Sequence, residues 1–257
     1  MNKSVWVIVF LSVALTSFVT YQITVSVNSN NYVKKDELKS YFDQYVDQST
    51  KAIFSAFVKG AKLQEQAAVE KKRQAIAESQ QSLENDSATP FIGDENGDVS
   101  IVMFSDYSCG YCKKSAPILE QVLEQDKNLK LIIKEFPILG PSSIISAKAA
   151  LAAYKLDKTK YSSLHKKLYT KILNSEKDLL ALAKAASIDG KSLLVEMAKP
   201  EYDQIVEKNQ VLASSLGING TPAFIIDGVL YPGALTDKQL QDIVNQVREK
   251  RQVKKEK

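Results

Sequence analysis

The sequence has few of the residues from which disulfide scaffolds and metal sites are built. Its 257 residues include only two cysteines, Cys109 and Cys112, and one histidine, His165. Two cysteines cannot form a disulfide scaffold, nor a four-cysteine zinc site within one chain. A single histidine excludes any mechanism that needs two imidazoles. We therefore predict no metal site.

An excess of charge is also absent once the C-terminus is set aside. The chain has 34 basic and 30 acidic residues; residues 248–257 hold six and two of these, which leaves 28 of each sign in residues 1–247. The net charge of +4 therefore indicates a solvated basic tail rather than a nucleic-acid-binding face. With 44% hydrophobic residues the chain can form a core, so it is not disordered throughout.

The N-terminus contains an uncharged apolar run. Lys3 is the only charged residue before Lys34, and residues 5–23 between them are mostly large and apolar. A lone positive charge before such a run is typical of a secretory signal, but no A-x-A cleavage site follows. The run is also about as long as a membrane span. The sequence predicts a signal peptide or signal anchor in residues 1–27 and leaves both open.

A long helix should follow. From Lys34 to Glu84 there is no proline and only one glycine, and strong helix formers dominate. Apolar residues recur near a 3-4 spacing, which favours burial against another helix: Leu38, Phe42, Tyr45, Ala52, Ile53, Ala56, Phe57 and Leu63. Ser49 and Lys59 interrupt this stripe. We predict an oligomerisation stalk over residues 28–84 and a linker over 85–90; a helix folded back on its own domain, or a frayed spacer, is the alternative.

The cysteine pair follows an apolar, β-branched run, Val99–Phe104, which predicts a buried strand. Asp106 or Ser108 could cap a helix that begins at the cysteines. The positive end of that helix would stabilise a Cys109 thiolate, and Cys112, one turn deeper, could resolve a mixed disulfide formed at Cys109. A structural disulfide across two residues would restrain little chain, and a zinc half-site lacks partners.

A second signal lies near the C-terminus. Thr221-Pro222 precedes an apolar run, residues 223–227, which predicts a strand, and Asp227-Gly228 predicts a hairpin turn. Residues 138–216 are poor in glycine and read as several amphipathic helices. Lys238–Lys250 predicts a terminal amphipathic helix.

Together these segments resemble the DsbA-like thiol:disulfide oxidoreductases of the thioredoxin superfamily. The resemblance is carried by residues 90–93 (PFIG), 104–117 (FSDYSCGYCKKSAP), 134–143 (KEFPILGPSS) and 220–228 (GTPAFIIDG). It implies an α/β thioredoxin fold from residues 91–137 and 217–247, with residues 138–216 as an inserted helical domain. It also implies a cis peptide bond before Pro222, substrate contacts from Gly110, Tyr111, Thr221 and Pro222, and no cofactor beyond a Cys109–Cys112 disulfide.

Two departures refine this expectation. The dipeptide between the cysteines is Gly-Tyr, which is familiar from disulfide isomerases, and the stalk resembles that of multimeric ScsC-type proteins. We therefore expect disulfide formation, isomerisation or both, on exported cysteine-containing proteins in the bacterial periplasm. A homo-oligomer and a membrane redox partner are further expectations. A holdase or a copper-binding thiol protein is the alternative.

Three other residues or motifs are weaker candidates for a function. Glu135, in the apolar run Leu131–Phe136, could relay the Cys112 proton, as a buried acid does in some thioredoxin relatives; otherwise it is an exposed or salt-bridged carboxylate. His165 lies in a lysine-flanked stretch and is expected at the surface. Gly190-Lys191-Ser192 is not a phosphate loop, because Ala185 replaces the first glycine that the motif requires.

Overall fold

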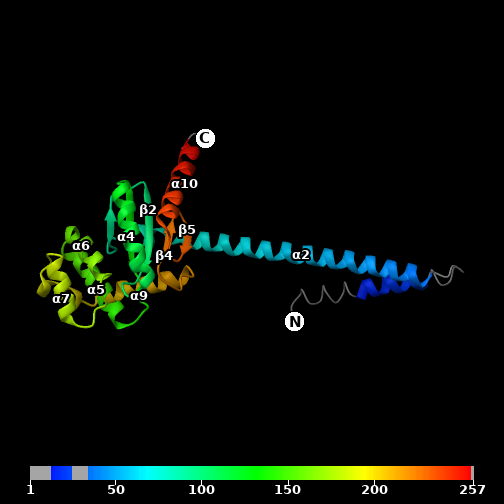
Figure 1. The fold of residues 1–257 in the computed structure, drawn as a ribbon, viewed down its shortest axis with the longest axis horizontal. Coiled ribbons are helices and arrows are strands. Elements are labelled where there is room, and N and C mark those ends of the chain that lie inside the picture. Colours follow the sequence, from blue (N-terminus) through cyan, green and yellow to red (C-terminus); the bar gives the residue numbers. More distant parts are fainter. Residues whose placement is uncertain (1–12, 25–33, 256–257) are drawn as a thin grey trace. The chain divides into compact units, whose positions relative to one another are not determined.

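The computed structural model describes residues 13–24 and 34–255, which belong to two compact units (Figure 1). The first unit, residues 1–67, contains a helix over residues 13–24 and most of α2 (Lys35–Glu78). No helix within the described ranges combines the length and apolar character of a membrane span. Residues 5–12 of the apolar run lie outside those ranges, so the signal or anchor in residues 1–27 stays a prediction.

The second unit, residues 68–257, is built on a mixed five-stranded sheet of order β1-β3-β2-β4-β5. β2 and β3 run parallel, and the other neighbouring pairs are antiparallel. The strands are β1 (Phe91–Gly93), β2 (Val99–Ser105), β3 (Leu129–Glu135), β4 (Ala223–Ile226) and β5 (Val229–Pro232).

Both faces of the central strands are buried, which explains why their sequences are apolar at nearly every position. On one face Ile101 and Met103 belong to a core that includes Cys112 and residues of α4 (Gly110–Gln125). On the other face Val102 and Phe104 pack in a second core with residues from the end of α2, α3 and α9. The cysteine-bearing helix therefore lies directly on the sheet.

Five helices connect β3 to β4, and Figure 1 shows α5, α6 and α7 grouped beside the sheet. Two of them begin with a side-chain N-cap from the residue directly before the helix. The Asp157 side chain accepts from the amides of Thr159 and Lys160 at the start of α6, and the Ser175 side chain accepts from the Asp178 amide at the start of α7. The helices are α5 (Pro141–Leu156), α6 (Lys158–Leu168), α7 (Glu176–Ala185), α8 (Gly190–Met197) and α9 (Glu201–Ser215).

The end of the predicted stalk is part of the second unit. α2 ends at Glu78 and a short helix, α3 (Gln80–Glu84), follows it. Ile76 is 3% exposed and Leu83 is 1% exposed, because both cover the sheet face that carries Phe104. The boundary between the units falls between Ala67 and Ala68, not at residue 84.

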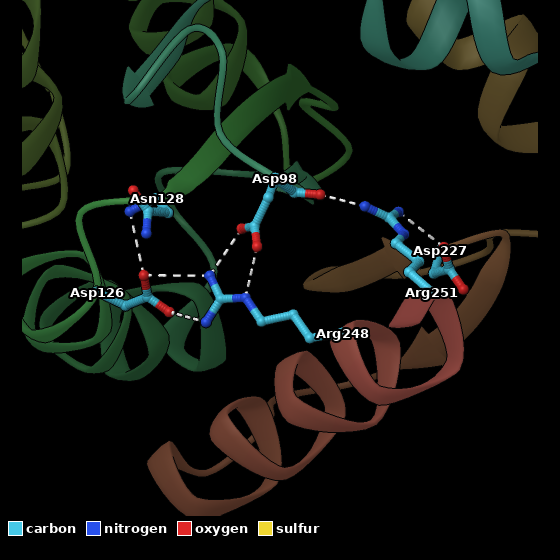
Figure 2. Close-up of polar contacts among 6 residues, drawn as sticks. All are labelled: Asp98, Asp126, Asn128, Asp227, Arg248 and Arg251. Carbon is cyan, nitrogen blue, oxygen red and sulfur yellow. Dashed lines mark hydrogen bonds and ion pairs between the residues drawn. The ribbon is translucent and has the colours of Figure 1, made fainter. Parts of the chain in front are cut away.

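The prediction of a solvated basic tail from residue 248 is wrong for its two arginines. α10 (Asp237–Lys255) continues through this segment. Arg248 forms ion pairs with Asp98 at 2.7 Å and with Asp126 at 2.6 Å, and Arg251 pairs with Asp227 at 2.8 Å (Figure 2). These carboxylates lie next to β2, at the end of α4 and after β4, so the arginines join α10 to the sheet unit.

Candidate active site

The cysteines occupy the beginning of α4, immediately after β2. Cys109 is the N-cap residue; its amide donates to the Asp106 carbonyl and its own carbonyl accepts from the Lys113 amide, both at 3.0 Å. Cys112 lies in the first turn and is fully buried, whereas Cys109 is 6% exposed. Both side chains are thiols in this structure. The two sulfurs therefore differ in access, as the spacing predicts.

Asp106 has a different role from the helix cap that the sequence suggests. No side-chain capping hydrogen bond is formed by the N-cap residue of α4. Asp106 instead accepts from the Ser108 amide with one carboxylate oxygen, at 2.8 Å, and from the Ile138 and Leu139 amides with the other, at 2.8 and 3.0 Å. It thus ties the turn before Cys109 to the segment that follows β3.

The loop before β4 completes the site. The peptide bond between Thr221 and Pro222 is cis, as the resemblance implies. The Cys109 thiol donates to the Thr221 carbonyl oxygen at 3.2 Å, although 112 residues separate them in the chain. β2 and β4 are neighbours, with Phe104 opposite Ala223, and this pairing brings the loop to the cysteines.

The surroundings move the two thiol pKa values apart. Burial raises the pKa of Cys109, but hydrogen bonds from the Thr221 side chain and the Cys112 backbone outweigh it, so the pKa is lowered from 9.0. Burial raises the pKa of Cys112 to about 12, against hydrogen bonds from the Asp106 backbone and the Ser105 side chain. Cys109 is therefore the sulfur that ionises more easily, and Cys112 is a thiol at neutral pH.

Glu135 is not exposed and has no salt bridge to any described residue, so that alternative is wrong. Its side chain is fully buried and Tyr107 donates a hydrogen bond to its Oε1 at 3.0 Å. Oε2 has no hydrogen-bond partner within the described part of the chain. Burial raises the pKa of this carboxyl well above 4.5. The described part of the chain contains no hydrogen bond between Glu135 and Cys112.

His165 is buried as well, so the expectation of a surface residue is wrong. Its Nδ1 lies 2.7 Å from the Tyr107 hydroxyl and 3.3 Å from the Tyr161 hydroxyl. Burial lowers its pKa to about 3, so the ring is neutral at pH 7. The sequence does carry a signal, because the buried face of α6 repeats at helical spacing: Tyr161, Leu164, His165 and Leu168.

The dipeptide between the cysteines faces outward. Tyr111 is 64% exposed, and Lys114 Nζ lies 5.6 Å from the centre of its ring. Gly110 is exposed, and a Cβ there would meet only open space. Both residues are accessible to another molecule.

A cavity of about 430 Å³ lies elsewhere, between α4, α6 and the sheet. Its lining includes Met103, Leu119, His165 and Tyr169 but neither cysteine. Within residues 13–24 and 34–255, no cluster of three or more His, Cys, Asp or Glu side chains could hold a metal ion.

Comparison with known proteins decides the family. A thioredoxin family model matches residues 84–246. The chain belongs to the thioredoxin family. The expected thioredoxin fold is thereby confirmed, with the cysteines and the cis proline inside the matched region.

Similar proteins indicate which type of thioredoxin-family protein this chain resembles. A linker-deletion variant of Proteus mirabilis ScsC is 29% identical with a TM-score of 0.69, covering 86% of this chain and 100% of its own. The thiol-disulfide exchange protein α-DsbA2 of Wolbachia pipientis is 30% identical with a TM-score of 0.66, covering 70% and 98%. Disulfide bond formation protein D of Bacillus subtilis is 24% identical over 54% of this chain and 67% of its own. These similarities support a thiol:disulfide oxidoreductase of the DsbA and ScsC type.

Proposed function

We propose that this protein catalyses disulfide formation, isomerisation or both in exported cysteine-containing proteins, through Cys109 and Cys112. One observation carries the proposal: the thiol that ionises more easily lies at the start of α4 against the Thr221 carbonyl, while its partner is buried one turn deeper. This arrangement presents one sulfur to a substrate and keeps the other for the internal step.

In the oxidising direction, a substrate thiolate attacks Cys109 of the Cys109–Cys112 disulfide. Cys112 leaves as a thiolate and takes up a proton, and a mixed disulfide remains at Cys109. A second substrate thiolate then attacks the substrate sulfur of that bond, and Cys109 leaves as a thiolate. The lowered pKa of Cys109 favours this last step, because a more stable thiolate is a better leaving group.

Isomerisation begins from the reduced pair. The Cys109 thiolate attacks a substrate disulfide, forms a mixed disulfide and releases one substrate thiolate, which can attack another disulfide of the same substrate. The thiolate freed by that rearrangement then attacks the substrate sulfur of the mixed disulfide, and Cys109 leaves as a thiolate. If rearrangement stalls, Cys112 attacks Cys109 and releases the substrate in reduced form. The redox-active disulfide is the only cofactor that this chemistry requires.

The residues around Cys109 are the proposed substrate contacts. Gly110 and Tyr111 are exposed beside it, and Thr221 and Pro222 border it from the other side. An extended peptide lying along this loop could form backbone hydrogen bonds there, in the manner of an added strand.

For location and partners, the apolar N-terminal run supports export to the bacterial periplasm, with the protein either released by cleavage or anchored by residues 5–23. A membrane redox partner would restore the oxidation state of the cysteine pair. We infer a homo-oligomer formed through α2, because large apolar side chains on this helix are between 65% and 72% exposed: Tyr41, Phe42, Ile53, Phe54 and Phe57.

The catalytic proposal is tested by replacing both cysteines with alanine. The Cys109→Ala/Cys112→Ala variant should lose insulin reduction and refolding of scrambled ribonuclease, whereas the neighbouring Ser108→Ala variant should keep both. Survival of the activities without the cysteines would refute redox catalysis and favour a non-enzymatic holdase. The redox state of the pair in cells then separates an oxidase, mostly oxidised, from an isomerase or reductase, mostly reduced.

The oligomer is tested by deleting residues 34–67 only, because residues 76 and 83 cover the sheet. The shortened protein should lose oligomer mass in solution and isomerase activity while it keeps oxidase activity. An unchanged number of subunits would refute the stalk model.

Glu135 is the proposed proton relay for Cys112. Its complete burial and raised pKa support this role, since a raised pKa makes the carboxylate a stronger base for the proton of a thiol.

A further inference from the structure

We propose that Ser105 and Tyr169 form a hydrogen-bonded pair that positions and stabilises the Cys112 thiolate during disulfide exchange. This inference deepens the proposed function and rests on it. Neither residue reacts with the substrate; both are positioning residues that act on the buried sulfur.

The pair is built into the structure at the end of β2. Ser105 is fully buried, and its backbone carbonyl accepts from the Phe136 amide at 2.8 Å, which fixes its place beside β3. Its Oγ lies 2.5 Å from the hydroxyl oxygen of Tyr169, which is 6% exposed and directly follows α6. Cys112 and Tyr169 belong to the same buried cluster, and the Ser105 side chain lowers the pKa of the Cys112 thiol as a hydrogen-bond donor. The hydroxyl pair is therefore placed to act on the buried sulfur.

Cys112 needs such help because water cannot reach it. Its side chain has no exposure, yet it must be a thiolate when it attacks Cys109 or leaves it. A buried anion is costly unless nearby donors stabilise it. The Asp106 backbone and the Ser105 side chain are the groups that favour the Cys112 thiolate most.

Two hydroxyls in series can serve both protonation states of the sulfur. Each hydroxyl can donate one hydrogen bond and accept others. When Cys112 is a thiol, it can donate to Ser105, which donates to Tyr169. When Cys112 is a thiolate, Tyr169 donates to Ser105, and Ser105 donates to the sulfur. Neither hydroxyl hydrogen-bonds any other group in the described part of the chain, so this reversal breaks no further bond.

The step that the pair assists balances as follows. Cys112 releases its proton to the medium through Glu135, the proposed relay, and its thiolate attacks Cys109 of the mixed disulfide. A bond forms between the two cysteine sulfurs, the bond between Cys109 and the substrate breaks, and the substrate leaves as a thiolate with the bonding electrons. The cysteine pair is oxidised by two electrons and the substrate disulfide is reduced by two.

Ellman's reagent separates this step from the first one. Reduced protein releases one equivalent of nitrothiobenzoate when Cys109 attacks the reagent, and a second when Cys112 resolves the mixed disulfide. The informative variants are Ser105→Ala and Tyr169→Phe. Tyr161→Phe is the matched control, because it also removes a buried hydroxyl, one that contacts His165 instead.

We expect both variants to slow the second phase by about tenfold, as befits a lost hydrogen bond to an anion, with the first phase unchanged. The pH dependence of the second phase should also move to higher pH, and Ser105→Thr should restore most of the rate. A merely structural defect would not shift one phase alone.

An unchanged second phase in both variants would overturn the pair, as would an equal slowing in Tyr161→Phe. Wild-type protein that releases only one equivalent would instead refute the proposed function, and the pair with it. If Ser105→Ala does not fold, Tyr169→Phe decides, since it keeps the ring and removes only the hydroxyl.

Discussion

Lys134 is a buried cation in the sheet, and replacing it should change how stability depends on pH. Its side chain is 1% exposed; its Nζ donates to Thr89 Oγ1 at 2.6 Å and lies 4.0 Å from Asp86. Burial lowers the pKa of Lys134 from 10.5 to about 8, against the attraction of Asp86, which raises it. The lysine thereby connects β3 to the segment that joins α3 to β1. The perturbation is Lys134→Met.

The size of the effect follows from the shift. One pKa unit corresponds to about 1.4 kcal/mol, so a fall from 10.5 to about 8 means that protonated Lys134 lowers the free energy of unfolding by about 3 kcal/mol relative to the neutral form. Between pH 8 and pH 10.5 the unfolded chain binds more protons than the folded one, so stability rises with pH. From pH 7 to pH 10 the gain is about 2.5 kcal/mol. Methionine does not titrate, so Lys134→Met lacks this gain in stability.

Urea unfolding at pH 7, 8, 9 and 10 measures this gain. Both cysteines should be serine in all proteins, so that thiol ionisation does not contribute. The difference in unfolding free energy between Lys134→Met and its parent should fall by about 2–3 kcal/mol over this range. Lys130→Met, which removes a partly exposed lysine from the same strand, is the control. Parallel pH curves for Lys134→Met and its parent would refute the buried charge.

Three further outcomes are expected. In Cys112→Ser, alkylation of Cys109 by iodoacetamide should reach half its maximal rate below pH 9, because its pKa is lowered; a midpoint at or above 9 would contradict this. Arg248→Ala should lower the free energy of unfolding by about 1 kcal/mol, and this loss should be smaller at high salt. Lys250 is exposed, so Lys250→Ala should have no measurable effect in the same urea titration. The pKa of Glu135 is raised in the folded state, so its stabilising contribution is present below pH 4.5 and is lost as the pH rises through the folded-state pKa. The stability of Glu135→Gln relative to wild type should therefore increase as the pH rises, and identical dependence of stability on pH in the two proteins would argue against a buried acid.

The central strands and their turn follow directly from the sequence. The β-branched run predicted from Val99 to Phe104 becomes β2, one residue longer. The Asp227-Gly228 hairpin also forms, with φ values of 50° and 75°, because these two residue types tolerate the positive φ that such a turn requires. β1 has only three residues, too few for an alternating pattern to be recognised.

Burial of polar side chains is harder to predict, because it depends on what covers each face. Lys134 and Glu135 are adjacent in β3 and point to opposite sides, so alternation suggests that one of them is exposed. Both are fully buried, since helices pack on both faces of this sheet. The burial of Lys134 depends on residues near the end of the predicted stalk, whose docking no local pattern reveals.

The same distinction governs the active site. Local signals place the cysteines correctly: a strand, a short turn and a helix start put Cys109 at a helix N-terminus and Cys112 inside. The pKa difference between them depends on features that no local pattern reveals. Burial raises the pKa of Cys112 to about 12, whereas at Cys109 the effect of burial is outweighed by hydrogen bonds, of which the one from the side chain of Thr221, distant in the chain, contributes most. Asp106 shows why local reading fails there. The Asp106 carboxylate could either cap α4 or accept a hydrogen bond from a distant segment. It accepts from the Ile138 amide, which would otherwise be unpaired. It follows that changing Thr221 or Ser105 should alter the chemistry of the pair more than changing the residues around α4 that make the motif recognisable.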